Sequence, residues 1–373
     1  MQHGNLHDFL SDASSITFSN NSQRAGTECA HKIIIKRNNM MKPIAVVCGA
    51  NGFLGRYLCR HWARKGYEIV AIARNRDGWS GDGMFLPWDG KNSGPWELAL
   101  EGASVVINLA GRSVDCRYDA RNRQEILESR VDSTKAIGRA IRKCRKAPAI
   151  WMNSSTATWY RHAENGPQDE WNGEMGTGFS VGVARAWEEA FFADATPAIT
   201  RKIALRTAMV MANEKKSVFD VLCRLTRWGL AGAMGTGRQH VSWIHMDDWL
   251  AAIDFLIADP LMDGVFNLVA PECPTNRELQ RSFREALAMP IGIPATENMV
   301  KIGAWLMNTE AELVLKSRWV KPMRLENQGF RWRHRTAERM IADLLGRPGL
   351  EGFFASKARR SIGARVWAHN YGA

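Results

Sequence analysis

Residues 44–55 read IAVVCGANGFLG, and this short stretch carries the strongest structural signal in the chain. Its first five residues form a continuous apolar run, which is typical of a strand buried on both faces. Glycines follow at positions 49, 52 and 55, and Phe53–Lys65 then carries apolar residues at helical spacing. Because a second apolar run occupies Tyr67–Ala73, the sequence predicts a strand–turn–helix–strand crossover of about 30 residues.

Each glycine of this turn has a separate physical task. The first permits the tight turn out of the strand, the second lets backbone approach a pyrophosphate, and the third lets helix and strand pack closely. The start of the helix supplies free N–H groups and the positive end of the helix dipole, which favour phosphate. The sequence therefore predicts a dinucleotide site. Its expected turn residues are Gly49, Asn51, Gly52, Phe53, Leu54 and Gly55.

The end of the second strand selects between NAD and NADP. NAD sites carry an acidic residue there, which hydrogen-bonds to the ribose 2′-hydroxyl. This chain carries Arg74 instead, and a guanidinium neutralises a 2′-phosphate and stacks on adenine. We therefore expect the cofactor NADP in preference to NAD; the alternative is that Arg74 is an ordinary solvated loop residue.

Strand-like and helix-like segments alternate through the first two-thirds of the chain. Further strands are predicted at 84–86, 104–109, 150–153 and 202–206, and helices at 120–143, 181–192 and 218–228. This alternation predicts an α/β fold, a Rossmann-type doubly wound parallel sheet. Beyond residue 246 the pattern changes to a smaller C-terminal α/β lobe, with one strand at 265–268 and helices at 247–257, 277–288, 300–306 and 335–345.

The chain therefore divides into four expected parts. Residues 1–40 are polar and rich in Ser, Asn and His, which indicates a disordered extension or an over-called start before Met40 and Met41. An NAD(P)-binding Rossmann domain is expected at 41–245, a substrate lobe at 246–349 and a basic tail at 350–373.

Charge, apolar runs and cysteine spacing limit the classes of binding partner that we expect. The net charge is +12, and residues from Leu315 onward hold 13 Lys and Arg against 4 Asp and Glu, so most of the excess is terminal. No nucleic-acid-binding motif and no membrane-spanning apolar run is present. The seven cysteines are scattered without a C-x-x-C, which indicates free thiols and no zinc site. We expect a cytoplasmic protein with a small-molecule substrate, no nucleic-acid or membrane partner, no metal, and a possible homodimer.

With these residues the chain resembles the extended short-chain dehydrogenase/reductase superfamily. It is most similar to an atypical nucleotide-sugar epimerase-like family with a characteristic C-terminal domain. The resemblance covers about Lys42 to Arg333. Its landmarks include GANGFLGR from Gly49, NLAGRSV from Asn108, ESRVDSTKAI from Glu128, SSTATWY from Ser154, GTGRQHVSWIHMDDW from Gly235 and LVLKSRWVKPMRLENQGFRW from Leu313.

The resemblance implies further contacts. Asn108, Ala110 and Gly111 would lie over the cofactor at the end of the fourth strand, and Asp89 near its adenine edge. Arg130 and Thr134 would flank the cleft from the long helix. The segment Gly235–His245 would form the mouth of a substrate pocket. Within it, Arg238 and Gln239 could bind an anionic group such as a diphosphate or only pack the loop, and Arg206 is similarly ambiguous.

His245 has a structural alternative as well. It could hold the shape of its loop, and Asp247 resembles the N-cap of the next helix.

The superfamily's catalytic pair is missing. A Tyr serves there as general acid/base, with a Lys four residues later that lowers its pKa. Counting back from Glu188 places Ser180 and Ala184 at those positions, and neither side chain can do this chemistry. Thr156 lies four residues before Tyr160, which is the spacing that these two hydroxyl residues show in ordinary epimerases. Tyr160 is therefore the candidate acid/base, against the alternative that it is only a pocket wall.

Two functions follow from these patterns. The first is an NADP-dependent oxidoreductase or epimerase acting on a small carbonyl or nucleotide-sugar substrate. In this reading Thr156 orients the reacting oxygen and Tyr160 or water handles the proton. The second is a non-catalytic NADP(H)-binding sensor or regulatory protein. Some relatives of the group carry labels connected with cell division, which suits that role.

Overall fold

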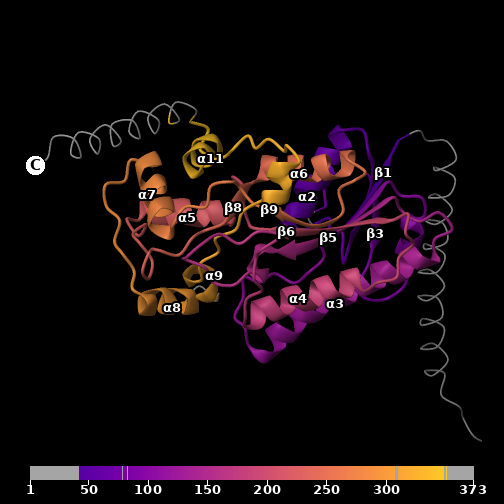
Figure 1. Cartoon of the computed structure of the whole chain (residues 1–373), viewed down its shortest axis with the longest axis horizontal. Helices are drawn as coiled ribbons and strands as arrows, with labels where there is room; N and C mark the ends of the chain where they lie inside the picture. The colour runs from indigo at the N-terminus through magenta and orange to yellow at the C-terminus, as the bar shows by residue number, and fades with distance from the viewer. Residues whose placement is uncertain (1–41, 78, 82, 307–309, 348–349, 351–373) are drawn as a thin grey trace, which may run out of the picture. The chain divides into compact units, whose positions relative to one another are not determined.

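A computed structural model of the chain describes residues 42–77, 79–81, 83–306, 310–347 and 350. The expected extension at 1–40 lies outside the described residues, as does all of the expected basic tail except residue 350. Nine β-strands alternate with helices along the described chain (Figure 1). None of the helices in this part is both long enough and apolar enough to cross a membrane.

Seven strands form one sheet in the order β3-β2-β1-β4-β5-β6-β9. The pairings β1–β2, β1–β4, β2–β3 and β6–β9 are all parallel. The order of the first six strands is the doubly wound Rossmann order, so the predicted fold class is confirmed. The strands are Ile44–Cys48 (β1), Glu68–Ala73 (β2), Met84–Pro87 (β3), Val105–Asn108 (β4), Ile150–Thr156 (β5), Arg201–Thr207 (β6) and Gly264–Leu268 (β9).

The chain forms two compact units. Unit 1 contains residues up to Ala110 with 132–151 and 194–201, and unit 2 contains 111–131, 152–193 and residues from Lys202 onward. In unit 1, helix α2 (Phe53–Arg64) follows β1 and buries Leu58 and Trp62. Helix η1 (Pro95–Leu100) buries Trp96. The central strands are almost entirely buried, which explains their continuous apolar sequence.

Helix α3 (Ala120–Lys143) runs through both units, and the remaining helices belong to unit 2. A hydrophobic core joins side chains of α5, α7 and α11 with the short parallel strands β7 (Met209–Met211) and β8 (Trp243–His245). Those helices are Val218–Arg227 (α5), Asn276–Ala286 (α7) and Ala337–Leu344 (α11). The others are η2 (Ala157–Trp159), α4 (Phe179–Phe192), α6 (Met246–Ala258), α8 (Glu297–Leu306), α9 (Glu312–Leu315) and α10 (Met323–Asn327).

Local sequence signals explain where several of these helices begin. Ser217 and Thr336 accept backbone N–H groups as N-caps of α5 and α11, and Thr275 with Glu278 forms a capping box on α7. The β7–β8 pair was not expected from the sequence, because three-residue strands carry too little periodicity. The strand expected at 265–268 is β9, which joins the main sheet beside β6.

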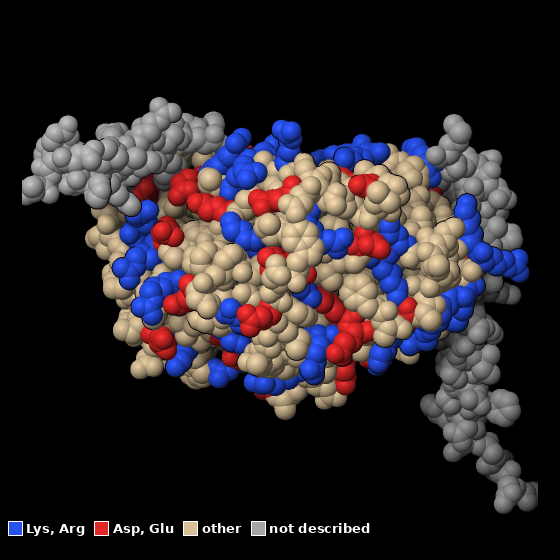
Figure 2. Space-filling model, in the orientation of Figure 1, with Lys and Arg blue, Asp and Glu red and all other residues tan. Residues whose placement is uncertain are grey.

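On the face shown in Figure 2, Lys and Arg side chains are interspersed with Asp and Glu side chains.

Candidate functional site

The glycine turn, residues Gly49–Gly55, has a backbone that leaves no room for side chains at two of its three glycines. Gly49 has φ +83°, and a Cβ there would lie 2.8 Å from the Leu109 carbonyl. A Cβ on Gly55 would meet the Gly49 carbonyl oxygen and, at 2.7 Å, Ala50 Cα. Gly52 is exposed and has only the Gly49 oxygen at 3.2 Å. The first and third glycines therefore shape the turn, while the second keeps its surface open.

Helix α2 begins directly at this open surface. Its N-cap Gly52 provides no capping side chain, and its first turn contains no acidic residue. The Arg56 guanidinium donates to the Asn51 carbonyl at 2.8 Å, which braces the turn from the helix side. Uncapped N–H groups at the positive end of a helix, beside a bare backbone, are the features that bind phosphate.

Asn51 ties the glycine turn to the loop after β2. Its Nδ2 donates to the carbonyl and the side-chain oxygens of Asn75, both at 3.2 Å, and to the Asp77 carbonyl at 3.4 Å. Arg74 lies in the same loop and is exposed. No hydrogen bond or ion pair to another described residue holds its guanidinium, so Arg74 can turn toward an anion beside the turn.

Two other expected cofactor residues of unit 1 form local structure. Asn108 is fully buried at the end of β4; its amide donates to Ser133 and Thr134 at 3.3 Å, and its oxygen accepts from Ala110 N–H at 3.0 Å. The hydroxyl of Thr134 thus accepts a hydrogen bond from the Asn108 side chain. Asp89 is exposed, and its carboxylate accepts the backbone N–H groups of Asn92 and Lys91. These hydrogen bonds lower the pKa of Asp89.

Gly111 and Arg130 meet in unit 2. The Arg130 guanidinium carbon lies 3.3 Å from the position that a Cβ on Gly111 would take, and the guanidinium donates to the Arg112 and Ile126 carbonyls at 3.0 Å. It also stacks on Trp187, 5.1 Å from the ring centroid. Burial lowers the pKa of Arg130 to about 10. These contacts hold the segment that follows β4.

Tyr160 belongs to a buried network of unit 2, which we call the arginine cluster: Ser155, Tyr160, Glu188, Arg206 and Asn267. Arg206 forms a two-pronged ion pair with Glu188, at 2.8 and 2.7 Å, and Ser155 donates to the same carboxylate at 2.5 Å. Burial by itself would lower the pKa of Arg206, but the Glu188 carboxylate outweighs it and the pKa lies above its ordinary value.

The Tyr160 hydroxyl is buried in this network and uses its proton in a hydrogen bond there. It donates to Asn267 Oδ1 at 3.0 Å, and the side chain is 1% exposed. Burial raises the pKa of Tyr160 to about 12, although the nearby Arg206 guanidinium opposes the shift. This environment fits the pocket-wall alternative better than a proton donor. An acid/base role for Tyr160 stays a prediction.

Thr156 is half-buried, and no acceptor among the described residues takes its hydroxyl proton. Its Oγ1 accepts the Thr158 N–H at 3.1 Å as the N-cap of η2, and this leaves the hydroxyl hydrogen for a further partner. The residues at the usual Tyr and Lys positions, Ser180 and Ala184, both lie in α4. A hydroxyl such as that of Thr156 can orient a carbonyl oxygen but titrates too high to exchange protons alone.

The expected substrate residues have unequal exposure. Arg238 is exposed and pairs with Glu164 at 3.3 Å. Gln239 is buried; its amide donates to the Met234 carbonyl at 2.9 Å, while its Oε1 has no hydrogen-bond donor among the described residues. His245 is buried, caps α6 by accepting the Asp247 N–H at 3.0 Å, and stacks on His334. The N-cap of α6 is therefore His245, and Asp247 is the second residue of the helix.

The cysteines of the described chain, Cys48, Cys59, Cys116, Cys144, Cys223 and Cys273, are free thiols, as expected. Burial raises the pKa of Cys59 to about 12 and that of Cys223 and Cys273 to about 11. Thiols with such pKa values are not reactive nucleophiles at neutral pH.

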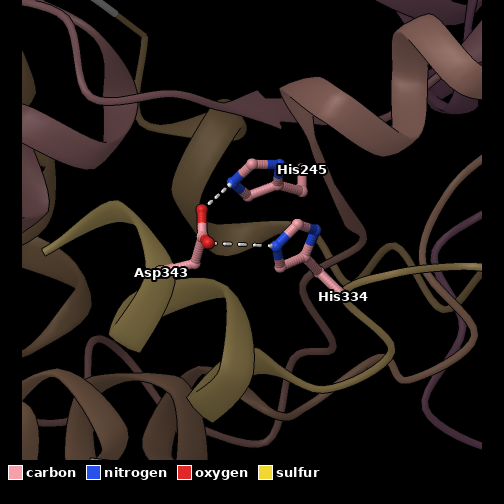
Figure 3. A group of neighbouring side chains, drawn as sticks. All are labelled: His245, His334 and Asp343. Carbon is pink, nitrogen blue, oxygen red and sulfur yellow. Dashed lines mark ion pairs between the residues drawn. The ribbon is translucent and has the colours of Figure 1, made fainter. Parts of the chain in front are cut away.

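Sequence reasoning missed three residues that the structure makes prominent. Glu188 was used only as a position marker, yet it neutralises the buried Arg206. His334 and Asp343 were not singled out, although both lie beside His245 (Figure 3). The one usable signal for the first was an acidic residue in an apolar helix, Phe179–Phe192. No spacing pattern connects the other two with His245.

Comparisons with known proteins identify the family of this chain. The model of the NAD dependent epimerase/dehydratase family matches residues 45–268, and a domain of unknown function, DUF1731, matches residues 299–344. An epimerase family protein of Mycobacterium leprae is 27% identical over 311 residues, 82% of this chain and 97% of the relative. The mouse epimerase family protein SDR39U1 is 26% identical over 291 residues, 77% of this chain and 94% of the relative.

Two solved structures show the same fold. The human epimerase family protein SDR39U1 (isoform 2), crystallised with NADPH, has a TM-score of 0.69 at 24% identity, covering 81% of this chain and 98% of that one. The Bordetella bronchiseptica enzyme WbmG, in complex with NAD, has a TM-score of 0.63 at 17% identity, covering 82% and 94%. Because the family model spans well over half of the chain, this protein belongs to the NAD dependent epimerase/dehydratase family.

Proposed function

We propose that this protein binds NADP(H) at the glycine turn and acts as an oxidoreductase or epimerase-like protein on a small carbonyl or nucleotide-sugar substrate. The observation that carries the proposal is the turn itself, where a Cβ on Gly49 or Gly55 would collide with backbone. That cradle fits a pyrophosphate, and the uncapped start of α2 lies next to it. When bound, the reduced cofactor supplies a hydride.

Arg74 supports NADP over NAD. Its exposed guanidinium is unengaged by other described residues, and Asn51 ties its loop to the glycine turn. A guanidinium attracts the 2′-phosphate that only NADP carries. The NADPH bound to the human relative is consistent with this choice.

A fluorescence titration of the full chain with NADPH and NADH tests the cofactor proposal. Arg74→Glu should weaken NADPH binding at least tenfold, about 1.4 kcal/mol or more, and leave NADH binding nearly unchanged. The matched control is Arg76→Glu, which reverses another exposed charge in the same loop. Equal losses for both cofactors in Arg74→Glu would refute NADP selection, and absence of any dinucleotide binding to the unaltered chain would refute the site.

The chain's own residues leave proton transfer to Thr156 with water, or to Tyr160 after its bond to Asn267 opens. Thr156 has a hydroxyl proton with which to orient a substrate oxygen. Oxidation of bound NADPH on addition of carbonyl compounds measures reductase turnover, and formation of an epimer from nucleotide sugars, which leaves the cofactor unchanged overall, measures epimerase turnover. Loss of that turnover in Thr156→Val, with NADPH affinity retained, supports the assignment of Thr156, and full turnover in this variant contradicts it.

One observation favours a second candidate, a non-catalytic NADP(H) sensor. The buried, hydrogen-bonded Tyr160 has a pKa of about 12, and Ser180 and Ala184 occupy the usual catalytic positions. In that case NADPH binds with micromolar affinity, while no carbonyl compound oxidises it and no nucleotide sugar is epimerised. The same turnover measurement therefore separates the two functions.

A further inference from the structure

Two stacked histidines from distant parts of the sequence meet a carboxylate in unit 2. His245 ends β8, His334 precedes α11, and Asp343 lies in the last turn of α11 (Figure 3). The imidazole centroids are 3.7 Å apart at 23°, and one ligand-type atom from each of the three side chains lies within 4.8 Å of the others. Both imidazoles are 2–3% exposed, while Asp343 is half exposed. We call these residues the histidine cluster.

The surroundings of His334 assign its proton. Its Nδ1 is 3.1 Å from Asp248 Oδ2, and the buried Asp248 also accepts the backbone N–H groups of Arg333 and His334, at 2.7 and 2.8 Å. A carboxylate that accepts these bonds is ionised, so the proton of the neutral imidazole resides on Nδ1. The lone pair of His334 then points from Nε2, which lies 3.6 Å from Asp343 Oδ1.

The surroundings of His245 assign the opposite tautomer. Its Nδ1 accepts the Asp247 N–H at 3.0 Å, so its own proton resides on Nε2. That nitrogen is 3.2 Å from Asp343 Oδ2 but has no aligned hydrogen-bond partner among the described residues. The cluster therefore contains two acceptors that face each other, with a buried donor beside them.

We propose that the histidine cluster binds a divalent transition-metal ion of the zinc type. Such an ion is bound at about 2.0–2.2 Å from imidazole nitrogen and carboxylate oxygen, which puts two tetrahedral ligands about 3.4 Å apart. The 3.6 Å between His334 Nε2 and Asp343 Oδ1 fits that separation, whereas it is too long for an N–H···O hydrogen bond. A metal ion therefore suits the gap better than a shared proton.

Each residue has a defined task at this site. His334 Nε2 and the Asp343 carboxylate are the ligands, and the Asp248–His334 contact is the carboxylate–imidazole pairing that orients metal-bound histidines. The His245 N–H donates to a water that completes the coordination, which the partial exposure of Asp343 admits. The ion would tie α11 to the segment before it and would add its binding energy to the stability of this region.

Calorimetric titration of the chelator-treated full chain with Zn²⁺ tests the site. The unaltered chain should bind one ion that Asp343→Asn weakens at least tenfold. The matched control is Asp247→Asn, which removes a neighbouring half-exposed carboxylate outside the cluster and should leave binding unchanged. His245→Asn keeps an N-cap for α6 and should cause a smaller loss, because it removes only the donor to the bound water.

A thermal melt supplies a readout that does not depend on activity. Zn²⁺ should raise the melting temperature of the unaltered chain and of Asp247→Asn, but not that of Asp343→Asn. Equal Zn²⁺ affinity in Asp343→Asn and the unaltered chain would place the ion elsewhere and overturn the proposal. So would the absence of Zn²⁺ binding up to millimolar concentration, which leaves a proton as the occupant of the gap.

Discussion

The glycine turn of unit 1 and the arginine cluster of unit 2 are built in opposite ways. The turn depends on the absence of side chains, because a Cβ at two of its glycines would collide with backbone. The arginine cluster works through side chains, since the buried Glu188 and Arg206 neutralise each other and Tyr160 hydrogen-bonds to Asn267. The glycine turn presents open backbone to an anion, whereas the polar side chains of the arginine cluster hydrogen-bond to one another.

This difference teaches where function is to be sought. A region whose N–H groups are uncapped can still bind, whereas one whose donors and acceptors are paired contributes mainly stability and shape. The prediction for the arginine cluster is therefore a large effect on folding, and for the turn an effect on both folding and cofactor binding. Three substitutions test this contrast.

The largest expected effect is that of Glu188→Gln. The substitution leaves the Arg206 guanidinium buried without its counter-charge, and breaking a buried pair in this way costs about 3–5 kcal/mol. Urea unfolding monitored by circular dichroism measures the loss. The matched control is Glu189→Gln, the next residue along α4, whose exposed pair with Arg185 is worth less than about 1 kcal/mol. Similar losses in both variants would contradict the paired-core account.

Gly49→Ala is expected to destabilise the protein by about 3 kcal/mol. The estimate combines about 1–2 kcal/mol for a left-handed backbone with about 1–3 kcal/mol for a Cβ forced against the Leu109 carbonyl. Gly66→Ala separates the two costs, because Gly66 has a similar φ of +87° but open space around it. Urea unfolding gives both values, and NADPH titration should show impaired binding only for Gly49→Ala. Equal losses would show that crowding at the turn is unimportant.

Tyr160→Phe should have the smallest effect of the three, about 1–2 kcal/mol at neutral pH, because it removes one buried hydrogen bond to Asn267. The folded-state pKa of about 12 lies above the usual value near 10, so burial favours the neutral phenol. The corresponding stability is present below about pH 10 and is lost as pH rises toward 12. The difference in unfolding free energy between the two chains should narrow over that range; a constant difference contradicts the raised pKa.

Sequence reasoning reached the two regions to different depths. The strand, turn and helix at 44–65 were predictable because apolar run, glycines and helical periodicity are local properties of the chain. For Tyr160 the sequence showed a plausible hydroxyl spacing, but its partner Asn267 lies 107 residues away. Glu188 and Arg206 were both noticed in the sequence, yet nothing in their spacing of 18 residues showed that they form a pair.

By itself, the sequence determined the doubly wound sheet, the glycine turn with its expected dinucleotide, and the arginine that follows the second strand. These depend on residue type and short-range period, which act before the chain has any long-range contacts. Only the tertiary structure decided the protonation and pairing of polar groups. It buried Tyr160 against Asn267, paired Glu188 with Arg206, and brought His334 and Asp343 to His245. Such outcomes depend on distances between remote residues and on loss of water around them, which no local pattern records.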